Sequence, residues 1–405
     1  FGKRWSRGQL LQVGAQQFAT ADPRGADGDQ LALFARVGWA AGEWSVDGFA
    51  STTSRTRNVM PRLLDDRAPL PPLDARRDLY YLRAGYGNPD LAGPWVQLVA
   101  AIQRFRETSE NPTTIPELPV DTVDTLARRS QFLASAGFTR GAARLGATVR
   151  VRAFDGETYL SPGARAEWTQ GIVAASAYVE RAADDSTLRA DVQLRVSPLP
   201  FVTLLGVASH HSPFGDDGRD SEQSFRAEAG VRVGRTWLSG GMMARGSALT
   251  PAPLAFDTGL AAVTREATGL FGQIRGPVWR DVSVSVTGVM WGDDDAGAGY
   301  VPRRQLRSEA TLDTRWLSRF PSGHFGLRAS IVHDWRDVVL FPLTDGTTSA
   351  VPASSVLDGL LEIRILDGVI WLQARNMTAV TWASTPGFVQ PATTLLYGVR
   401  WQFWN

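Results

Sequence analysis

The sequence predicts an all-β fold: a transmembrane antiparallel β-barrel of about 20 strands, roughly 18–22, with short turns at one rim and long loops at the other. Three observations predict this fold. Apolar and polar residues alternate with a period of two, short and long connections alternate along the chain, and tryptophans gather near the expected strand ends. All 405 residues are accounted for by one barrel domain, residues 1–405.

Alternation marks the predicted strands. From Leu188 to Val196, leucine, alanine and valine occupy the even positions, and Arg189, Asp191, Gln193 and Arg195 occupy the odd ones. A period of two is the spacing of a β-strand, and a charged face repeated this often indicates a wet interior. A soluble sandwich would place the apolar face inside, so alternation alone leaves both folds open. The pattern recurs at 145–153, 164–168, 225–233, 306–316, 325–335 and 361–365.

Short and long connections between the predicted strands alternate strictly along the chain. Tight links are expected at residues 41–42, 88–93, 140–142, 170–171, 197–200, 234–235, 275–278, 318–322 and 366–368. Between them lie links that are mostly long and rich in Gly, Pro and Asp, at residues 20–28, 54–77, 107–129, 155–159, 182–186, 210–222, 246–262, 292–303, 338–354 and 382–391. This rhythm is typical of outer-membrane barrels, whose short turns are periplasmic and whose long loops are extracellular, and it favours the barrel over the sandwich.

Tryptophans are expected at the two levels where the strands leave the membrane, because an indole ring prefers the membrane–water boundary. The alternative is that tryptophan is simply a good strand residue. The expected girdle residues are Trp39, Trp44, Trp95, Trp168, Trp237, Trp279, Trp316, Trp371 and Trp401.

The polar face of the predicted strands carries both signs of charge, with arginine in excess. The expected pore-lining residues are Arg144, Arg150, Arg152, Arg189, Arg195, Arg226, Glu228, Arg232, Arg307, Glu309, Asp313 and Arg328. Opposite charges on neighbouring strands would mostly pair with each other in a wet lumen. The functional interpretation is a mildly anion-favouring channel lining.

Composition argues against several other classes of protein. The chain has no cysteine, which excludes disulfides and thiolate metal sites, and its net charge of +1 gives no field that attracts nucleic acid. No stretch has the roughly 20 apolar residues of a transmembrane helix. Only four histidines are present. We therefore expect no enzyme, no cofactor and no bound metal.

Two clusters of polar residues suggest metal ligands only weakly. His210 and His211 are followed by three aspartates, Asp216, Asp217 and Asp220. Residues 293–295 are three consecutive aspartates, without the spaced pattern of a calcium loop. Solvated loops are the expected structure at both places.

The last two predicted strands resemble the end of a TonB-dependent receptor barrel. The features shared are Arg375 with Asn376, then 386–388 with its Pro-Gly pair, and a final strand with Gly398 and alternating aromatics through Phe403. The resemblance implies a barrel of twenty-two strands with an N-terminal plug that couples to an energy-transducing protein. Strand pattern here begins by about Gln9, so we expect no plug within this chain.

These expectations define a bacterial, Gram-negative outer-membrane barrel that passes small hydrophilic solutes, as a porin-like channel does. Its expected partners are outer-membrane lipid, lipopolysaccharide and those solutes. Two alternatives stay open: a structural or docking barrel in a surface assembly, and a receptor barrel whose plug is cleaved or is a separate protein. The two longest links, 54–77 and 107–129, are expected either to narrow the lumen or to cover its mouth.

Overall fold

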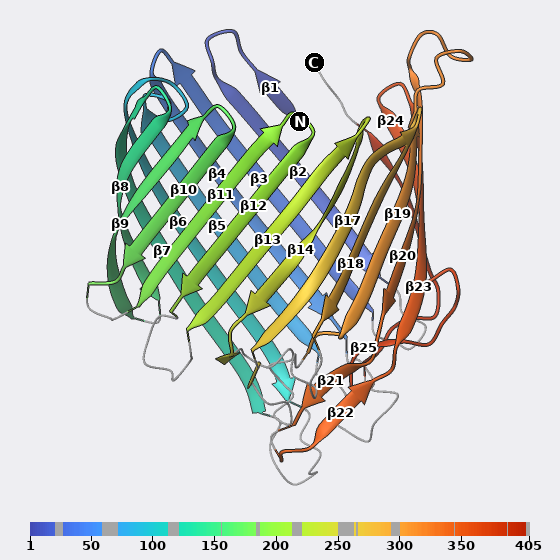
Figure 1. Ribbon diagram of the computed structural model, residues 1–405. Helices are drawn as coiled ribbons and strands as arrows, with labels where there is room; N and C mark the ends of the chain where they lie inside the picture. The colour runs from blue at the N-terminus through green and yellow to red at the C-terminus, as the bar shows by residue number, and fades with distance from the viewer. Residues whose placement is uncertain are drawn as a thin grey trace. The chain divides into compact units, whose positions relative to one another are not determined.

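The computed structural model describes residues 1–20, 27–58, 72–111, 121–154, 156–183, 187–212, 221–249, 263–264, 266–292, 300–343, 345–386 and 388–401 (Figure 1). All regular structure within these ranges is β, as the alternation predicts. None of the described residues forms a helix long and apolar enough to cross a membrane. Of the 27 described strands, 21 belong to one large sheet, and each strand pairing with a determined register is antiparallel.

The chain divides into two compact units, and the expectation of a single domain over residues 1–405 stays a prediction. The first unit comprises residues 1–170 and 176–190, and in it β1 to β9 pair in chain order. Its strands are β1 (Gly2–Arg4), β2 (Leu10–Thr20), β3 (Gly28–Ala41), β4 (Trp44–Arg57), β5 (Leu73–Tyr86), β6 (Gly93–Asn111), β7 (Asp121–Arg140), β8 (Ala143–Phe154) and β9 (Glu157–Gln170). Residues of both units contribute to β10 (Val173–Arg181) and β11 (Leu188–Leu199).

The second unit comprises residues 171–175 and the described chain from Asp191 onward. Its strands in the large sheet are β12 (Val202–His211), β13 (Glu222–Val233), β14 (Thr236–Arg245), β17 (Ala267–Trp279), β18 (Val282–Trp291), β19 (Arg304–Thr314), β20 (Phe325–Arg336), β23 (Ser354–Ile365), β24 (Gly368–Arg375) and β27 (Thr394–Trp401). Three short pairs lie within the links: β15 (Ala248–Leu249) with β16 (Val263–Thr264), β21 (Val339–Pro342) with β22 (Thr348–Val351), and β25 (Ala383–Thr385) with β26 (Phe388–Val389).

Most of the expected tight links are turns at the predicted place. The links at 41–42 and 140–142 are two-residue turns that begin on Gly42 and Gly141, with φ angles of 57° and 56°. Glycine suits these positions because it lacks the Cβ that disfavours a positive φ.

The link expected at 275–278 is wrong, because β17 continues to Trp279 and the turn lies at Arg280 and Asp281. A register shift between Pro277 and Trp279 accommodates the proline, which cannot donate a ladder hydrogen bond. The link expected at 197–200 also starts later, after Leu199.

The two longest expected links, 54–77 and 107–129, begin farther along the strands than expected. In the expected loop 107–129, β6 continues to Asn111 and β7 starts at Asp121, so that Glu107 is opposite Thr125. The apolar alternation stops earlier, but backbone pairing does not depend on it and continues through polar residues. Of the prolines in these two links, Pro61, Pro69, Pro71, Pro112, Pro116 and Pro119 lie outside the described residues, whereas Pro72 directly precedes β5.

The two faces of the strands differ in composition and in exposure. In β3, the face with Leu31, Leu33, Val37 and Trp39 is 40 to 55% exposed, whereas Arg36, on the other face, is half-buried. This is the reverse of a soluble sandwich, which buries its apolar face. Large exposed apolar surfaces are typical of sites that contact lipid or another protein.

The second unit contains a small hydrophobic core away from the main strands. Val339, Phe341, Val351 and Ala383 are buried together, with Tyr300 and Leu343 packed against them. Figure 1 shows their short strands β21, β22 and β25 gathered at one end of this unit, beyond β20 and β23. We call this group the loop core.

Candidate functional site: the polar face of the sheet

The expected pore-lining residues of the first unit lie on one face. Residues directly opposite each other in neighbouring strands point to the same side. Thr139 of β7, Arg144 of β8 and Glu167 of β9 are aligned in this way, and so are Gln131, Arg152 and Tyr159. Arg144, Arg150 and Arg152 alternate along β8 and therefore share this polar face.

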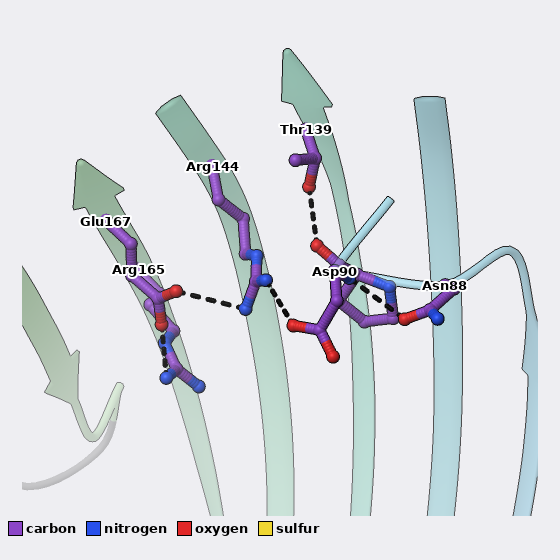
Figure 2. Close-up of polar contacts among 7 residues, drawn as sticks. Asn88, Asp90, Thr139, Arg144, Arg165 and Glu167 are labelled. Carbon is purple, nitrogen blue, oxygen red and sulfur yellow. Dashed lines mark hydrogen bonds and ion pairs between the residues drawn. The ribbon is translucent and has the colours of Figure 1, made fainter. Parts of the chain in front are cut away.

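Arg144 links the β5–β6 turn to the neighbouring strands (Figure 2). Its guanidinium forms ion pairs with Asp90 in that turn and, at 3.0 Å, with Glu167 on β9. Glu167 is also paired with Arg165. The turn is held further by a hydrogen bond of 2.9 Å from the Asp90 N–H to Asn88 Oδ1 and by one of 2.8 Å from the Thr139 hydroxyl to the Pro89 carbonyl. This group of contacts fixes the turn against the polar face.

A second charged group lies farther along the same strands, around the buried carboxylate of Glu180, which is 3% exposed. Arg152 donates to its Oε1 at 2.7 Å, Arg150 is 3.2 Å from its Oε2, and the Tyr178 hydroxyl also donates to Oε2. The guanidinium of Arg189 lies 5.6 Å from the centre of the Tyr178 ring. We call these five residues the Glu180 cluster.

The Glu180 cluster carries three arginines for one carboxylate, so it is positively charged. A buried carboxylate needs such partners, because desolvation penalises its charge. The pore-lining residues expected from the sequence include the three arginines but not Tyr178 or Glu180. The spacing of these two residues could have placed them on the polar face, since Tyr178 and Glu180 flank Val179 as residues of one strand face do.

The polar face of the first unit is rich in arginine beyond these groups. The register places on it Arg36, Arg55, Arg57, Arg77, Arg83, Arg129 and Arg165, against Asp47, Glu107, Glu157 and Glu167. Arg36 donates two hydrogen bonds to Asp47, at 2.8 and 2.9 Å. Arginines therefore outnumber carboxylates among the described residues of this face.

In the second unit, the predicted residues also lie on one face and mostly form local pairs. Arg226 and Glu228 are 2.7 Å apart, and Arg307 is paired with Asp334 at 3.0 Å. Asp313 stands opposite Arg328 in the register. The remaining contacts are Thr311 to Glu309 at 3.0 Å, Arg232 to the Pro200 carbonyl at 3.2 Å, and Arg328 and Arg400 with Glu362 at 3.9 and 3.7 Å.

The position of Ser197 shows which face of β11 carries Arg195. The hydroxyls of Ser197 and Thr203 are 3.3 Å apart across β11 and β12, and Thr203 shares the polar face with Arg226 through the register. Arg195, two residues before Ser197, therefore projects to the same side.

The expected girdle tryptophans divide into two groups. Trp39, Trp44, Trp168, Trp279, Trp316 and Trp401 are exposed, and Trp39, Trp44, Trp168 and Trp401 belong to the apolar face by register. Trp316 lies in the link between β19 and β20, 6.3 Å from the ring of Phe325. A position at the membrane boundary stays a prediction for these six.

The girdle assignment is wrong for Trp95, Trp237 and Trp371, which lie on the polar face. In the register, Trp237 is opposite Arg232 and Trp371 is opposite Glu362. Trp95 is only 7% exposed. Each ring covers a glycine of a neighbouring strand, namely Gly137, Gly230 or Gly398. Closeness to a turn does not determine which face a side chain takes.

Asn376 makes the hydrogen bonds that fix the link between β24 and β27 in the second unit. This residue is 3% exposed and has a φ angle of 50°. Its Nδ2 donates to the carbonyls of Val380, at 2.8 Å, and Pro391, at 3.1 Å, and its Oδ1 accepts from the Val380 N–H at 3.1 Å. Its own N–H donates to Asp358 Oδ1 at 2.8 Å. One side chain thus closes the link between β24 and β27.

Arg336, Asp337 and Asp345 also make polar contacts in the links of the second unit. Arg336 donates to Ser354 Oγ at 3.0 Å and to the carbonyl of Ala383, which belongs to the loop core. Hydrogen bonds from the Thr347 hydroxyl and N–H lower the pKa of the Asp345 carboxyl. The Val338 N–H and Arg304 do the same for the pKa of Asp337.

Within the described residues there is no group of three or more His, Asp or Glu side chains arranged to hold a metal ion. His210 Nε2 lies 3.3 Å from Ser212 Oγ, and His211 stands opposite Glu222. The aspartates Asp216, Asp217 and Asp220, and residues 293–295, lie outside the described ranges.

Known structures share the fold of this chain. The FrpB iron transporter from Neisseria meningitidis (F5-1 variant, apoprotein form) matches with a TM-score of 0.71 at 10% identity, over 97% of this chain and 76% of its own. The siderophore receptor PirA from Acinetobacter baumannii matches with a TM-score of 0.68 at 11% identity, over 98% and 77%. The ferric yersiniabactin uptake receptor FyuA from Yersinia pestis matches with a TM-score of 0.64 at 12% identity, over 97% and 75%.

No protein-family model matches the sequence, and no curated protein sequence matches it. Structural similarity at these identities shows the fold alone. The fold of this chain is that of these transporter and receptor structures, and this likeness confirms the resemblance to a receptor barrel seen in the closing strands.

Proposed function

We propose that the chain is a barrel of the bacterial outer membrane that passes small hydrophilic solutes. The observation that carries the proposal is the contrast between the faces of the strands: the apolar face is exposed and the polar face is arginine-rich. A membrane barrel requires this arrangement, with apolar side chains toward lipid and polar ones toward a wet lumen. The proposal includes closure of about 20 strands, with short turns in the periplasm and long loops outside.

The lumen is proposed to favour anions. The described polar face of the first unit carries more arginines than carboxylates, and the Glu180 cluster alone has three arginines to one carboxylate. Rings of arginine in a pore raise the local concentration of anions. Small anionic or neutral hydrophilic molecules are therefore the proposed solutes. No catalytic role and no cofactor are proposed.

Single-channel recording in planar bilayers tests both parts of the proposal. With a salt gradient across the bilayer, the reversal potential should indicate anion preference, and Arg307→Gln should reduce that preference. Arg140, an exposed residue of β7 on the apolar face, provides the matched control, and Arg140→Gln should leave selectivity unchanged. Clear cation preference would contradict the anion lining, and a silent barrel would contradict solute passage.

A second candidate is a receptor barrel whose plug is cleaved or separately encoded. It is favoured by the fold comparisons, because the matched proteins are described as an iron transporter, a siderophore receptor and a ferric yersiniabactin uptake receptor. Sequencing the N-terminus of the cellular precursor tests the cleaved form of this candidate, since an upstream plug would appear at once.

A structural or docking barrel is the third candidate. It is favoured by the loop core, a packed hydrophobic group within the links of the second unit. A barrel that inserts into bilayers, stays silent and is recovered bound to another outer-membrane protein would support it.

A further inference from the structure

An arginine and a tryptophan end two strands on the polar face of the second unit. Arg245 is the last residue of β14 and Trp291 is the last residue of β18, both at the long-link end of their strands. In the register, one row runs from Arg226 on β13 through Met243 and Gly269 to Trp291. Arg226 belongs to the polar face, so Trp291, and Arg245 two residues after Met243, project to the same side. We call Arg245 and Trp291 the Arg245 site.

The ring of Trp291 supports the side chain of Arg245. The Arg245 guanidinium lies 5.3 Å from the centre of this ring, which is a cation–π contact. The ring in turn lies against Gly269 on β17, where a Cβ would come within 3.0 Å of Cε3 of Trp291. The missing side chain at Gly269 therefore gives the ring its place, and the ring gives the guanidinium its place.

Three N–H groups of the Arg245 site have no acceptor. Within the part of the chain that the structure describes, no atom accepts a hydrogen bond from Nε or Nη2 of Arg245 or from Nε1 of Trp291, and all three nitrogens are covered from solvent. Glu222, two residues before Ser224 on β13, is the acidic residue that the register brings nearest, yet it forms no ion pair with Arg245. Covered donors without acceptors cost free energy, so an acceptor that reaches them binds favourably.

The two unpartnered nitrogens of Arg245 lie on one edge of the guanidinium, and this edge binds carboxylates elsewhere in the chain. Nε and Nη2 of Arg36 donate to the two carboxylate oxygens of Asp47, at 2.9 and 2.8 Å. The same two nitrogens of Arg304 donate to Asp337 Oδ2, at 3.0 and 2.9 Å. Two N–H groups side by side match a planar carboxylate. Among the described residues, Arg245 presents this edge without a carboxylate.

We propose that the Arg245 site binds the carboxylate group of a small organic solute. The edge formed by Nε and Nη2 takes both oxygens, and the Trp291 N–H is a further donor. Met243 and the Trp291 ring, both half-buried, offer apolar contact to the organic part of such a solute, which inorganic phosphate lacks. Because the edge is covered, the long Arg245 side chain turns outward to admit the carboxylate. The inference deepens the proposed function and rests on it, since a solute reaches this face through a wet lumen.

The test is the binding of benzoate to the full purified chain in detergent, measured by titration with ligand-observed NMR. Arg245→Lys keeps the charge but loses the two-donor edge, and it should weaken binding about tenfold, as the loss of one charge-assisted hydrogen bond does. Trp291→Phe keeps a ring and loses the N–H, and it should weaken binding about threefold. Arg275→Lys is the matched control, because Arg275 also lies on the polar face, opposite Trp237, and it should bind benzoate as the parent chain does.

Two competitors identify the ligand chemistry. Benzamide has the same ring without the charge, and neither benzamide nor millimolar inorganic phosphate should displace benzoate. Equal binding by Arg245→Lys and the parent chain, or displacement by either competitor, would overturn the proposal.

Bilayer recording on the parent chain tells the two proposals apart. A chain that conducts but binds no benzoate overturns the carboxylate site and leaves solute passage standing. A chain that binds benzoate in detergent but stays silent in bilayers overturns solute passage and leaves the carboxylate site standing.

Discussion

The indole ring of Trp237 fills the space that a side chain at Gly230 would take. A Cβ at Gly230 would lie 2.1 Å from Cζ2 of Trp237, and the nearest atoms that it would meet all belong to this ring. The two residues lie on adjacent strands, β13 and β14, on the polar face. The same relationship joins Trp371 to Gly398, where the distance is 2.9 Å. Aromatic rings over strand glycines are thus a repeated packing device on this face.

Gly230→Ala should therefore destabilise the chain, because the added methyl group displaces the Trp237 ring. Overpacking of this kind costs about 1–3 kcal/mol. Urea unfolding from lipid vesicles, followed by tryptophan fluorescence, measures the loss. Gly206→Ala provides the control, since a Cβ at Gly206 on β12 meets no atom within 4 Å. Equal stability of the two variants would contradict the packing role of Trp237.

Glu180→Gln should destabilise the first unit. The substitution leaves Arg150 and Arg152 without the carboxylate that they share at 3.2 and 2.7 Å. Removing one partner of a buried ion pair costs about 3 kcal/mol or more, because the remaining charge stays desolvated. Glu157→Gln is the control, since Glu157 is an exposed carboxylate on the same face. Urea midpoints that shift equally in both variants would show that Glu180 acts only as a surface charge.

Local patterns predicted the faces and most of the turns. Arg144, Arg150 and Arg152 are on one face because alternation in a strand follows from the backbone alone. The turn at Gly42 is where expected. Its positive φ angle has to be adopted by one residue only, so the glycine at that position is enough to predict it. Both kinds of inference need only a few consecutive residues, so no knowledge of the neighbouring strands is required.

Features that depend on neighbouring strands were not predicted. The contact of Trp95 with Gly137 is set by the register of β6 and β7, which no local pattern reveals. The arginine partners of Glu180 are two strands away, on β8. The ends of β6 and β7 were missed because polar residues continue the pairing beyond the apolar rows. Short pairs within the links, such as β21 with β22, carry too few residues for a visible alternation.

Asn376→Ala should open the link between β24 and β27. The substitution removes the side-chain hydrogen bonds to Val380 and Pro391 and places alanine at a φ angle of 50°. Lost buried hydrogen bonds cost about 1–3 kcal/mol, which is enough to loosen a link locally without unfolding the sheet. Limited proteolysis should cut this link faster, while urea unfolding of the whole chain changes little.

Thr378→Val is the control for this variant, because Thr378 is exposed and makes only one hydrogen bond to Asn376, at 3.3 Å. Its rate of cleavage should match that of the parent chain. Equal protection of the Asn376→Ala link would show that the loop core, and not Asn376, holds this segment.

Thr347→Val should raise the pKa of Asp345 toward its ordinary value. The Thr347 hydroxyl is the main cause that lowers this pKa, and the Thr347 N–H, which the substitution keeps, is the second. A depressed carboxyl pKa stabilises the folded β21–β22 turn above the unfolded pKa, and this contribution is lost as pH falls through the folded value. The variant should therefore lose this contribution at a higher pH than the parent chain. Carboxyl chemical shifts of Asp345 measured from neutral to acidic pH report the titration, with Thr348→Val as the control. An unchanged midpoint in Thr347→Val would assign the depressed pKa to the backbone N–H alone.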